Sequence, residues 1–551
     1  MYIAVVPNRN SPPAILLRES YRIGKKVKTR TVANLTHWPV ARVEALRRCL
    51  RGEFDGKQDT TVPVSDRIFA VLFALKAMAQ RQGIVSALGL TRLAKLALFL
   101  VLARVAHQGS RLSAVRWAQD HAVAEVLGLT SFDEDDLYLA LDWLAAQQET
   151  IEKKLYRAYI KRVGTPPVLV LYDVTSSYFE GDQNELAEYG YNRDGKKGCD
   201  PRRARCPCEG KKQIVIGLLT APDGEPLAVR VFRGNRSDPT TVAEQIQIIK
   251  AQFAIEEVVF VGDRGMVKAT GKTALTEEGL RYITALTDAQ VRKLLKRGII
   301  QLDLFDETAQ EVADGDRRLI LRRNDAVRRK EAMRRQDKLT KLQRHVTERN
   351  SFVREAKRAD PTAGLRKLTA WVKAHQINAF VTLTLEEAEI HVVIDEEKQA
   401  DAALLDGCYV IETDVDKAHM DAQTVAARYM DLQKVERDFR TMKTGLLETR
   451  PIFVRKETRT RGHVFATMLA LKVAREMDGC LKKAFGTTQE SAYTLTLDDA
   501  LGALSRFCFQ RHEIAGQVFL QLPRLDPRQE AIFRALGIQP PQTRMGQPIK
   551  V

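Results

Sequence analysis

The feature that most limits the fold is the order of strand-like and helix-like segments between residues 166 and 286. A Pro pair precedes VLVLYDVTSSYF, whose β-branched and aromatic residues predict a strand. Two more strands are expected around the turn Pro222-Asp223-Gly224. Next come a helix (TTVAEQIQIIKAQFA), a strand ending in a turn (EEVVFVGDRG), a short helix (ATGKTALTEEGL) and a strand (RYITAL). This order predicts a mixed sheet with helical cover.

The segments around this sheet predict a multidomain α/β chain, because 551 residues exceed one ordinary core. Upstream, apolar residues return at three- and four-residue steps, and Ser110 is a plausible helix N-cap. From about 287 to 415, strand-like runs (IIQLDLF, RRLILRR, NAFVTLTLEE, AEIHVVIDEE, CYVIET) flank a charged helical stretch from Asn324 to about His375. The predicted regions are 1–55 (strand and basic arm), 56–164 (helical, DNA-binding), 165–286 (core, first part), 287–415 (β-rich and helical insertion), 416–480 (core, second part) and 481–551 (helical tail).

The charge of the chain points to a polyanionic partner. It has 87 Lys and Arg against 70 Asp and Glu, a net charge of +17 and a pI near 9.5. Such a balance favours nucleic acid first and an anionic membrane second. The basic stretch Arg22–Arg30 could lie along phosphates as an arm. The charged stretch from Asn324 could be a rail for the DNA backbone or a solvated helix with i,i+4 pairs.

Other compositional signals narrow the class of protein. No segment reaches the roughly 18 uninterrupted apolar residues that a membrane span needs, and the N-terminus lacks a secretion-signal layout. Seven cysteines, an odd number, predict a reducing compartment. Cys199, Cys206 and Cys208 cluster locally, but a four-ligand zinc site would need another ligand, and an exposed loop is the preferred interpretation.

Three carboxylates stand where metal-dependent chemistry would need them. Cleavage of a phosphodiester without a covalent intermediate needs an activated water and a stabilised leaving oxygen, which two divalent ions about 3.5–4 Å apart supply. Asp173 lies within the first predicted strand, and Asp263 ends the strand VVFVG. Glu436 lies on a predicted helix from Tyr429 to Lys443, at the border of its apolar stripe. Taken singly, each has a plainer interpretation: a strand-end Asp, an Asp-turn residue and a surface Glu paired with a neighbouring Arg.

Together these motifs resemble the DDE transposases of bacterial insertion sequences, in the IS-four-like group with a strand-rich insertion. The matching pieces are YDVTSSYF with Asp173, FRGNRSD, VFVGDRGM with Asp263, a long insertion, and then Tyr429, Glu436 and Lys443. The group's signature also has an Arg between the Tyr and the Glu, and this chain has Leu432 there. Arg440 is the candidate replacement, because it falls on the same side of the predicted helix.

The resemblance implies a ribonuclease-H-like mixed-sheet core that cleaves DNA ends at terminal inverted repeats and joins the 3′-hydroxyls to target DNA. It implies that Asp173, Asp263 and Glu436 hold two Mg²⁺ ions, for which Mn²⁺ can substitute. Tyr429, Lys443 and Arg440 would contact DNA phosphates, and Arg264 would add a phosphate contact or merely cap its turn. A homodimer is expected because two ends must be paired. A bacterial, nucleoid-associated location in the cytoplasm follows, without a membrane partner.

Two alternatives remain open at this point. One is a catalytically inactive DNA-binding repressor derived from a transposase, and the other is a nuclease of the same fold without strand transfer. His463 opens a predicted helix and is interpreted as a buried structural residue rather than a catalytic one.

Overall fold

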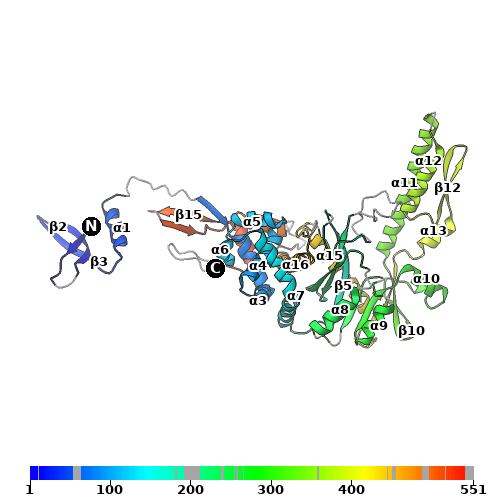
Figure 1. Cartoon of the computed structure of the whole chain (residues 1–551), viewed down its shortest axis with the longest axis horizontal. Coiled ribbons are helices and arrows are strands. Elements are labelled where there is room, and N and C mark those ends of the chain that lie inside the picture. Colours follow the sequence, from blue (N-terminus) through cyan, green and yellow to red (C-terminus); the bar gives the residue numbers. More distant parts are fainter. Residues whose placement is uncertain are drawn as a thin grey trace.

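The computed structural model describes residues 1–9, 12–53, 64–179, 181, 183–190, 211–236, 241–253, 255, 258–264, 266–267, 269–356, 359–443, 445–449, 454–486, 495–514 and 517–539. The cluster Cys199, Cys206 and Cys208 lies outside these residues. The expected mixed α/β architecture is confirmed, and its centre is a large mixed sheet (Figure 1).

Eight strands of the described residues form this sheet in the order β10-β11-β14-β9-β8-β5-β6-β7. Their bounds are β5 (Leu169–Tyr178), β6 (Gln213–Thr220), β7 (Pro226–Arg233), β8 (Val259–Gly262), β9 (Arg281–Ala285), β10 (Gln310–Asp314), β11 (Arg317–Arg323) and β14 (Cys408–Thr413). Strands β5, β8 and β9 run parallel, and every other neighbouring pair is antiparallel. The strand and hairpin order expected between residues 166 and 286 is therefore confirmed.

The region expected as a separate insertion contributes to this sheet. Strands β10, β11 and β14 extend it beyond β9, so RRLILRR and CYVIET are strands of the core rather than of a module of their own. The run IIQLDLF was expected as a strand, but it holds the short 3-10 helix Leu302–Leu304. The bounds of the six predicted regions stay predictions.

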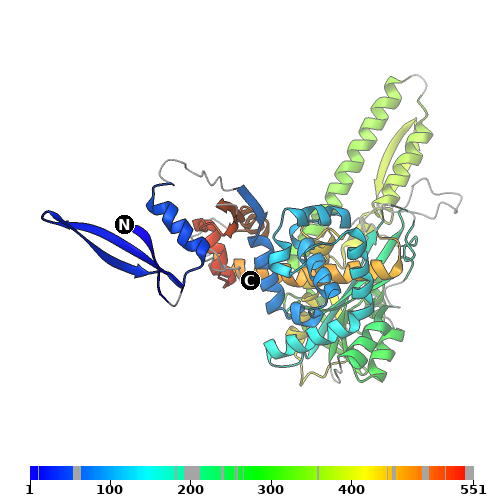
Figure 2. The same cartoon turned by 60° about the vertical axis from the view of Figure 1, so that its left-hand side comes forward.

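The rest of the insertion projects from the sheet as a smaller unit (Figures 1 and 2). It consists of α11 (Asp325–Glu355), α12 (Pro361–Ala374), the hairpin β12 (Val381–Glu386) and β13 (Glu389–Ile394), and α13 (Glu396–Ala403). It has a hydrophobic cluster of its own. The single charged helix expected from Asn324 to His375 is two helices, because Asp360 caps a new helix and Pro361 starts it.

The upstream helices build the main core together with the second half of the chain. They are α2 (Ala70–Arg81), α3 (Ile84–Leu88), α4 (Arg92–Ala106), α5 (Arg111–Gln119), α6 (Val123–Leu127) and α7 (Glu134–Val163). Ser110 caps α5, as expected, by accepting a hydrogen bond from the Ser113 amide. Helix α4 is buried almost all round and packs against α7 and α16 (Glu457–Phe485), which is also largely buried. A helix that is apolar on every side needs such enclosure.

The C-terminal tail, expected to be helical, also contains strands. Helices α17 (Leu497–Leu504) and α18 (Pro527–Leu536) flank the hairpin of β15 (Cys508–Ile514) and β16 (Gln517–Gln521). Strand β15 also pairs with β4 (Val64–Ile68), which sequence periodicity had assigned in part to a helix. None of the described helices is both long enough and apolar enough to cross a membrane.

The N-terminal residues form a small separate sheet with one helix (Figures 1 and 2). Strand β1 (Tyr2–Val6) was expected. The basic stretch expected as an arm is instead part of a long hairpin, β2 (Ala14–Ile23) with β3 (Lys26–Asn34). Helix α1 (Val40–Leu50) packs against β1.

The crossing of α16 with α7 gives the first testable prediction. A Cβ added to Gly462 of α16 would collide with the backbone carbonyl of Leu141 in α7. We expect Gly462→Ala to lower the free energy of unfolding by about 1–3 kcal/mol, the usual cost of overpacking. The matched control is Gly479→Ala in the same helix, because a Cβ there meets no atom within 4 Å. That control should gain up to about 1 kcal/mol from helix propensity. Urea unfolding measures both, and equal stabilities would contradict the close crossing.

Candidate active site

Strands β5 and β8 bring Asp173 and Asp263 to neighbouring positions. Their parallel register pairs Tyr172 with Gly262, so the two Asp residues are the next in line on each strand. Strand β8 ends at Gly262, which leaves Asp263 exposed beyond its carboxyl end, whereas Asp173 is only 9% exposed within β5. The Asp173 carboxylate accepts a hydrogen bond from the Val174 amide (2.7 Å), and Asp263 accepts one from the Arg264 amide (2.6 Å).

Strand alternation shows which face of the sheet these carboxylates occupy. Leu169 and Leu171 of β5 pack into the main core, while Val170 and Tyr172 pack into the cluster on the opposite face. Successive side chains of a strand point to opposite faces, so Asp173 projects on the side of Leu171. Helix α15 (Leu432–Lys443) packs against β5 and adds Leu432 and Val435 to the same main core. The helix that carries Glu436 therefore covers the face on which Asp173 lies.

The expected single helix from Tyr429 to Lys443 is wrong in one respect. It is broken at Asp431, so that Tyr429 belongs to α14 (Ala422–Met430) and Glu436 to α15. The Asp431 carboxylate pairs with Arg428 (3.1 Å) on one side of the break and with Lys434 (2.9 Å) on the other.

Because of the break, the two helices pack on different strands of the sheet. Helix α14 packs on β8, β9, β11 and β14, whereas α15 lies over β5. From α14, the Tyr429 hydroxyl donates a hydrogen bond to Asp263 Oδ1 (3.2 Å). Burial and the Asp263 charge together raise the pKa of Tyr429, so it stays a neutral donor. The phosphate contact predicted for Tyr429 stays a prediction.

Helix α15 presents its side chains as its periodicity predicts. Leu432, Val435, Phe439 and Met442 are buried, and Glu436 and Arg440 are exposed beside them. Leu432, in the place where the resembled family has an Arg, is a core residue that is 7% exposed. The predicted DNA contacts of Arg440 and Lys443 are not tested by this geometry.

A buried ion pair anchors α15, and sequence reasoning missed it. Asp438 is 2% exposed and pairs with Arg475 of α16 (2.6 Å). Burial raises the pKa of the Asp438 carboxyl to about 6, although Arg475 opposes the shift. Lys434 donates to the Pro222 carbonyl (2.6 Å) in the β6–β7 turn. These contacts fix the rotation of α15 about its axis and hence the side on which Glu436 stands. Helical periodicity could have predicted that Asp438 is buried, because it follows Val435 by three residues on the buried stripe of the helix. A buried carboxylate in turn indicates a cationic partner.

The fit to a divalent metal is partial. The donors are carboxylate oxygens, which Mg²⁺ prefers. Asp173 lies within β5, Glu436 lies on α15, and Asp263 directly follows β8. Among the described residues, however, no three His, Cys, Asp or Glu side chains lie close enough together to hold a metal ion as they stand. A metal site would therefore need a side-chain or helix movement that brings the three carboxylates together.

Comparison with known families decides what the chain is. A model described as the transposase DDE domain matches residues 164–471, more than half of the chain. The chain belongs to the DDE transposases. A second model, the N-terminal domain of IS1634 family transposases, matches residues 3–63 of this transposase.

Other comparisons add little. No curated protein matches the transposase. Among solved structures, it is similar to a piggyBac transposase synaptic complex with hairpin DNA, at 10% identity and a TM-score of 0.33, over 87% of this chain and 81% of that one. A likeness this weak supports no detail of the fold.

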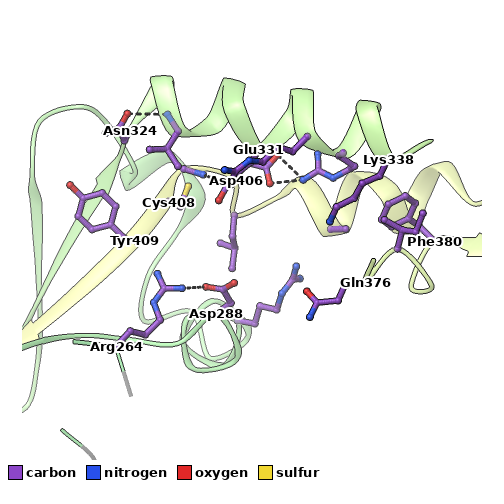
Figure 3. Close-up of a pocket in the computed structure, with 18 of the residues that line it drawn as sticks. Arg264, Asp288, Asn324, Glu331, Lys338, Gln376, Phe380, Asp406, Cys408 and Tyr409 are labelled. Atoms are coloured by element: carbon purple, nitrogen blue, oxygen red, sulfur yellow. Dashed lines mark hydrogen bonds and ion pairs between the residues drawn. The ribbon is translucent and has the colours of Figure 1, made fainter. Parts of the chain in front are cut away.

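A cavity of about 570 Å³ adjoins the Asp263 end of the site, between the core sheet and the projecting unit (Figure 3). Arg264 and Tyr429 line its core side, and α11 lines the other. Arg264 pairs with Asp288 (2.7 Å) at the start of α10 (Asp288–Lys296), and the two point toward each other in Figure 3. The structure thus shows an ion pair that was not predicted for Arg264. The phosphate contact and the turn-capping role predicted as alternatives for Arg264 stay predictions. Further cations on the walls are Arg292, Arg334, Arg335 and Lys338.

His463 is buried, as expected of a structural residue. Its Nδ1 lies 3.1 Å from a guanidinium nitrogen of Arg111. Burial, with Arg111 and Arg104 nearby, lowers the pKa of His463 well below its usual value. The neutral ring therefore accepts from Arg111 in the helical core of the transposase.

Proposed function

We propose that this transposase binds the terminal inverted repeats of an insertion sequence, cleaves their ends by metal-dependent hydrolysis and joins the 3′-hydroxyls to target DNA. The observation that carries the proposal is the pairing of Tyr172 with Gly262, which makes Asp173 and Asp263 neighbours, while the helix of Glu436 packs on the strand of Asp173. This arrangement supports a ribonuclease-H-like core.

In the proposed site, Asp173, Asp263 and Glu436 would hold two Mg²⁺ ions, for which Mn²⁺ could substitute. When bound, such ions would activate a water and stabilise the leaving 3′-oxygen. The chain's own residues do the positioning. Tyr429 orients the Asp263 carboxylate through its hydrogen bond, and the anchors of α15 hold Glu436 over β5.

Cations outnumber carboxylates on the walls of the cavity beside Asp263, where Asp288, Glu331 and Asp406 are the acidic residues. This positive excess suits a DNA strand that leaves the site. Arg264, Arg440 and Lys443 are proposed contacts to its phosphates, and Arg264 must then leave Asp288. The charged helix α11 would continue the same path as a rail. Two such chains would act as a homodimer on paired ends, on the nucleoid of a bacterial cell.

One assay tests the proposal. Labelled inverted-repeat ends are incubated with the protein and Mg²⁺, and Glu436→Gln is compared with the wild type. The matched control is Glu530→Gln, an exposed Glu on α18. Cleavage and joining that disappear only in Glu436→Gln support the proposal. Binding without cleavage in every sample means a repressor, and cleavage without joined product means a nuclease. Either outcome overturns the proposal.

A further inference from the structure

The β2–β3 hairpin is a long ribbon whose outer half is exposed in the part of the chain that the structure describes. Its register runs from Leu16 with Asn34 to Ile23 with Lys26, and a two-residue turn closes it. Gly24 takes φ 61° in that turn, which a side chain would disfavour. Every residue from 20 to 32 is exposed. Isolated two-stranded ribbons are marginally stable in water, so an exposed ribbon of this length is suited to a partner surface.

The register sorts the side chains of the ribbon onto two faces. Residues directly opposite each other in an antiparallel pair share a face. Lys26, Lys28 and Arg30 therefore form one row, and their partners Ile23, Tyr21 and Glu19 form the row beside it. The guanidinium of Arg30 pairs with Glu19 (2.7 Å) and lies over the Tyr21 ring (5.9 Å to its centroid). We call this the cationic face.

The cationic face mixes charge with exposed apolar surface. Tyr21 is 40% exposed and Ile23 is 55% exposed. The opposite face of the ribbon carries two cations, Arg18 and Arg22, together with Ser and Thr hydroxyls. A surface of this kind can meet both phosphates and base edges.

The positive charge around the ribbon indicates that its binding partner is a polyanion. Residues 1–51 contain eleven Lys and Arg against two Glu, a net charge of +9 out of +17 for the whole chain. Helix α1 adds Arg47 and Arg48 in its last turn. Less than a tenth of the chain thus carries about half of its excess positive charge, which favours long-range attraction to DNA.

The width of the ribbon indicates which groove of duplex DNA it can enter. Two strands lie about 4.8 Å apart, and with their side chains they fit a major groove about 12 Å wide but not a minor groove about 6 Å wide. The helices expected to recognise DNA are less suitable, because α4 is almost wholly buried and α2 and α7 pack into the same core.

We propose that the β2–β3 ribbon places its cationic face in the major groove of duplex DNA at the transposon end. This rests on the proposed function only in taking transposon DNA as the substrate. The ribbon binds DNA through residues that take no part in cleavage.

Binding of the full-length protein to an inverted-repeat duplex, measured in EDTA at several salt concentrations, tests the proposal. We expect Lys26→Ala/Lys28→Ala/Arg30→Ala to lower the affinity at least about tenfold. The slope of log K against log salt should fall by about 0.9 for each lost phosphate contact. The matched control is Arg524→Ala/Arg528→Ala/Arg534→Ala, which removes the same charge from exposed positions on and before α18.

Three outcomes would overturn the proposal. The first is an equal loss of affinity in the ribbon variant and the control. The second is displacement of the wild type by the minor-groove ligand netropsin but not by the major-groove ligand methyl green. The third is a changed oligomeric state with unchanged DNA affinity, which would make the ribbon a contact between copies.

Two controls separate a loss of DNA binding from a loss of folding and from DNA cleavage. The charge-conserving variant Lys26→Arg/Lys28→Arg/Arg30→Lys should retain binding, and circular dichroism reports any loss of structure. EDTA prevents metal-dependent cleavage, so this binding is independent of catalysis. Binding without cleavage in Mg²⁺ would overturn the proposed function alone, and cleavage with an unaffected ribbon variant would overturn the ribbon proposal alone.

Discussion

Asp263→Asn is expected to abolish DNA cleavage and leave the fold intact. The residue is exposed beyond the end of β8, and Asn has nearly the same size, so packing is unaffected. The amide lacks the charge that the proposed metal site needs. Losing several kcal/mol of transition-state stabilisation corresponds to a fall of about a thousandfold or more. Single-turnover cleavage of labelled ends in Mg²⁺ measures the fall.

Tyr429→Phe separates the charge of Asp263 from its hydrogen bond. This variant removes only the hydroxyl that donates to Asp263 at 3.2 Å. A hydrogen bond to a charged group contributes about 1.5–3 kcal/mol, so we expect a fall of roughly a hundredfold or less. A rate for Asp263→Asn within that range, in a protein with wild-type melting behaviour, would refute the assignment of Asp263 as a metal ligand.

Glu152→Ala is expected to be the most destabilising single change in the core. Glu152 of α7 is fully buried, and both of its oxygens accept from Arg230 of β7 at 2.9 Å. Gln148 (2.9 Å), Gln252 (2.7 Å) and the Val229 amide (3.3 Å) also donate hydrogen bonds to Glu152. Removing the carboxylate leaves the buried Arg230 charge without this partner, which usually costs about 3–5 kcal/mol. The shift in the urea unfolding transition measures the loss.

The double variant Glu152→Leu/Arg230→Met is the control for this prediction. It removes both charges and keeps similar volumes, so we expect it to be more stable than Glu152→Ala. If the double variant were the less stable of the two, the network would contribute more as a pair than its desolvation costs.

Local patterns in the sequence predicted much of the site. The buried stripe of α15 follows from helical periodicity, and the strands that position Asp173 and Asp263 follow from their apolar runs. Periodicity could not detect the break at Asp431, because a single non-helical residue hardly changes the angular pattern. The break decides which strand each helix covers, and so it decides that Tyr429 meets Asp263.

Pairings between distant segments could not be read from the sequence. Strand β4 falls in the region that was predicted to be helical, because its partner, β15, lies more than four hundred residues away. Strands β11 and β14 were expected outside the core because their own sequences do not reveal which sheet edge they join. The pairing of a strand depends on a partner strand elsewhere in the chain, whereas the apolar periodicity of a helix can be recognised within its own segment.

The enclosure of α4 by α16 has a consequence for biosynthesis. The ribosome makes α4 long before the residues of α16 exist, so the part of its apolar surface that α16 covers stays uncovered by that helix during the intervening synthesis. At about 5–20 residues per second, that interval lasts roughly tens of seconds. A nascent chain truncated before α16 would keep this surface open and be a substrate for chaperones and proteases. The N-terminal ribbon needs no such wait, since its strands are neighbours in the chain.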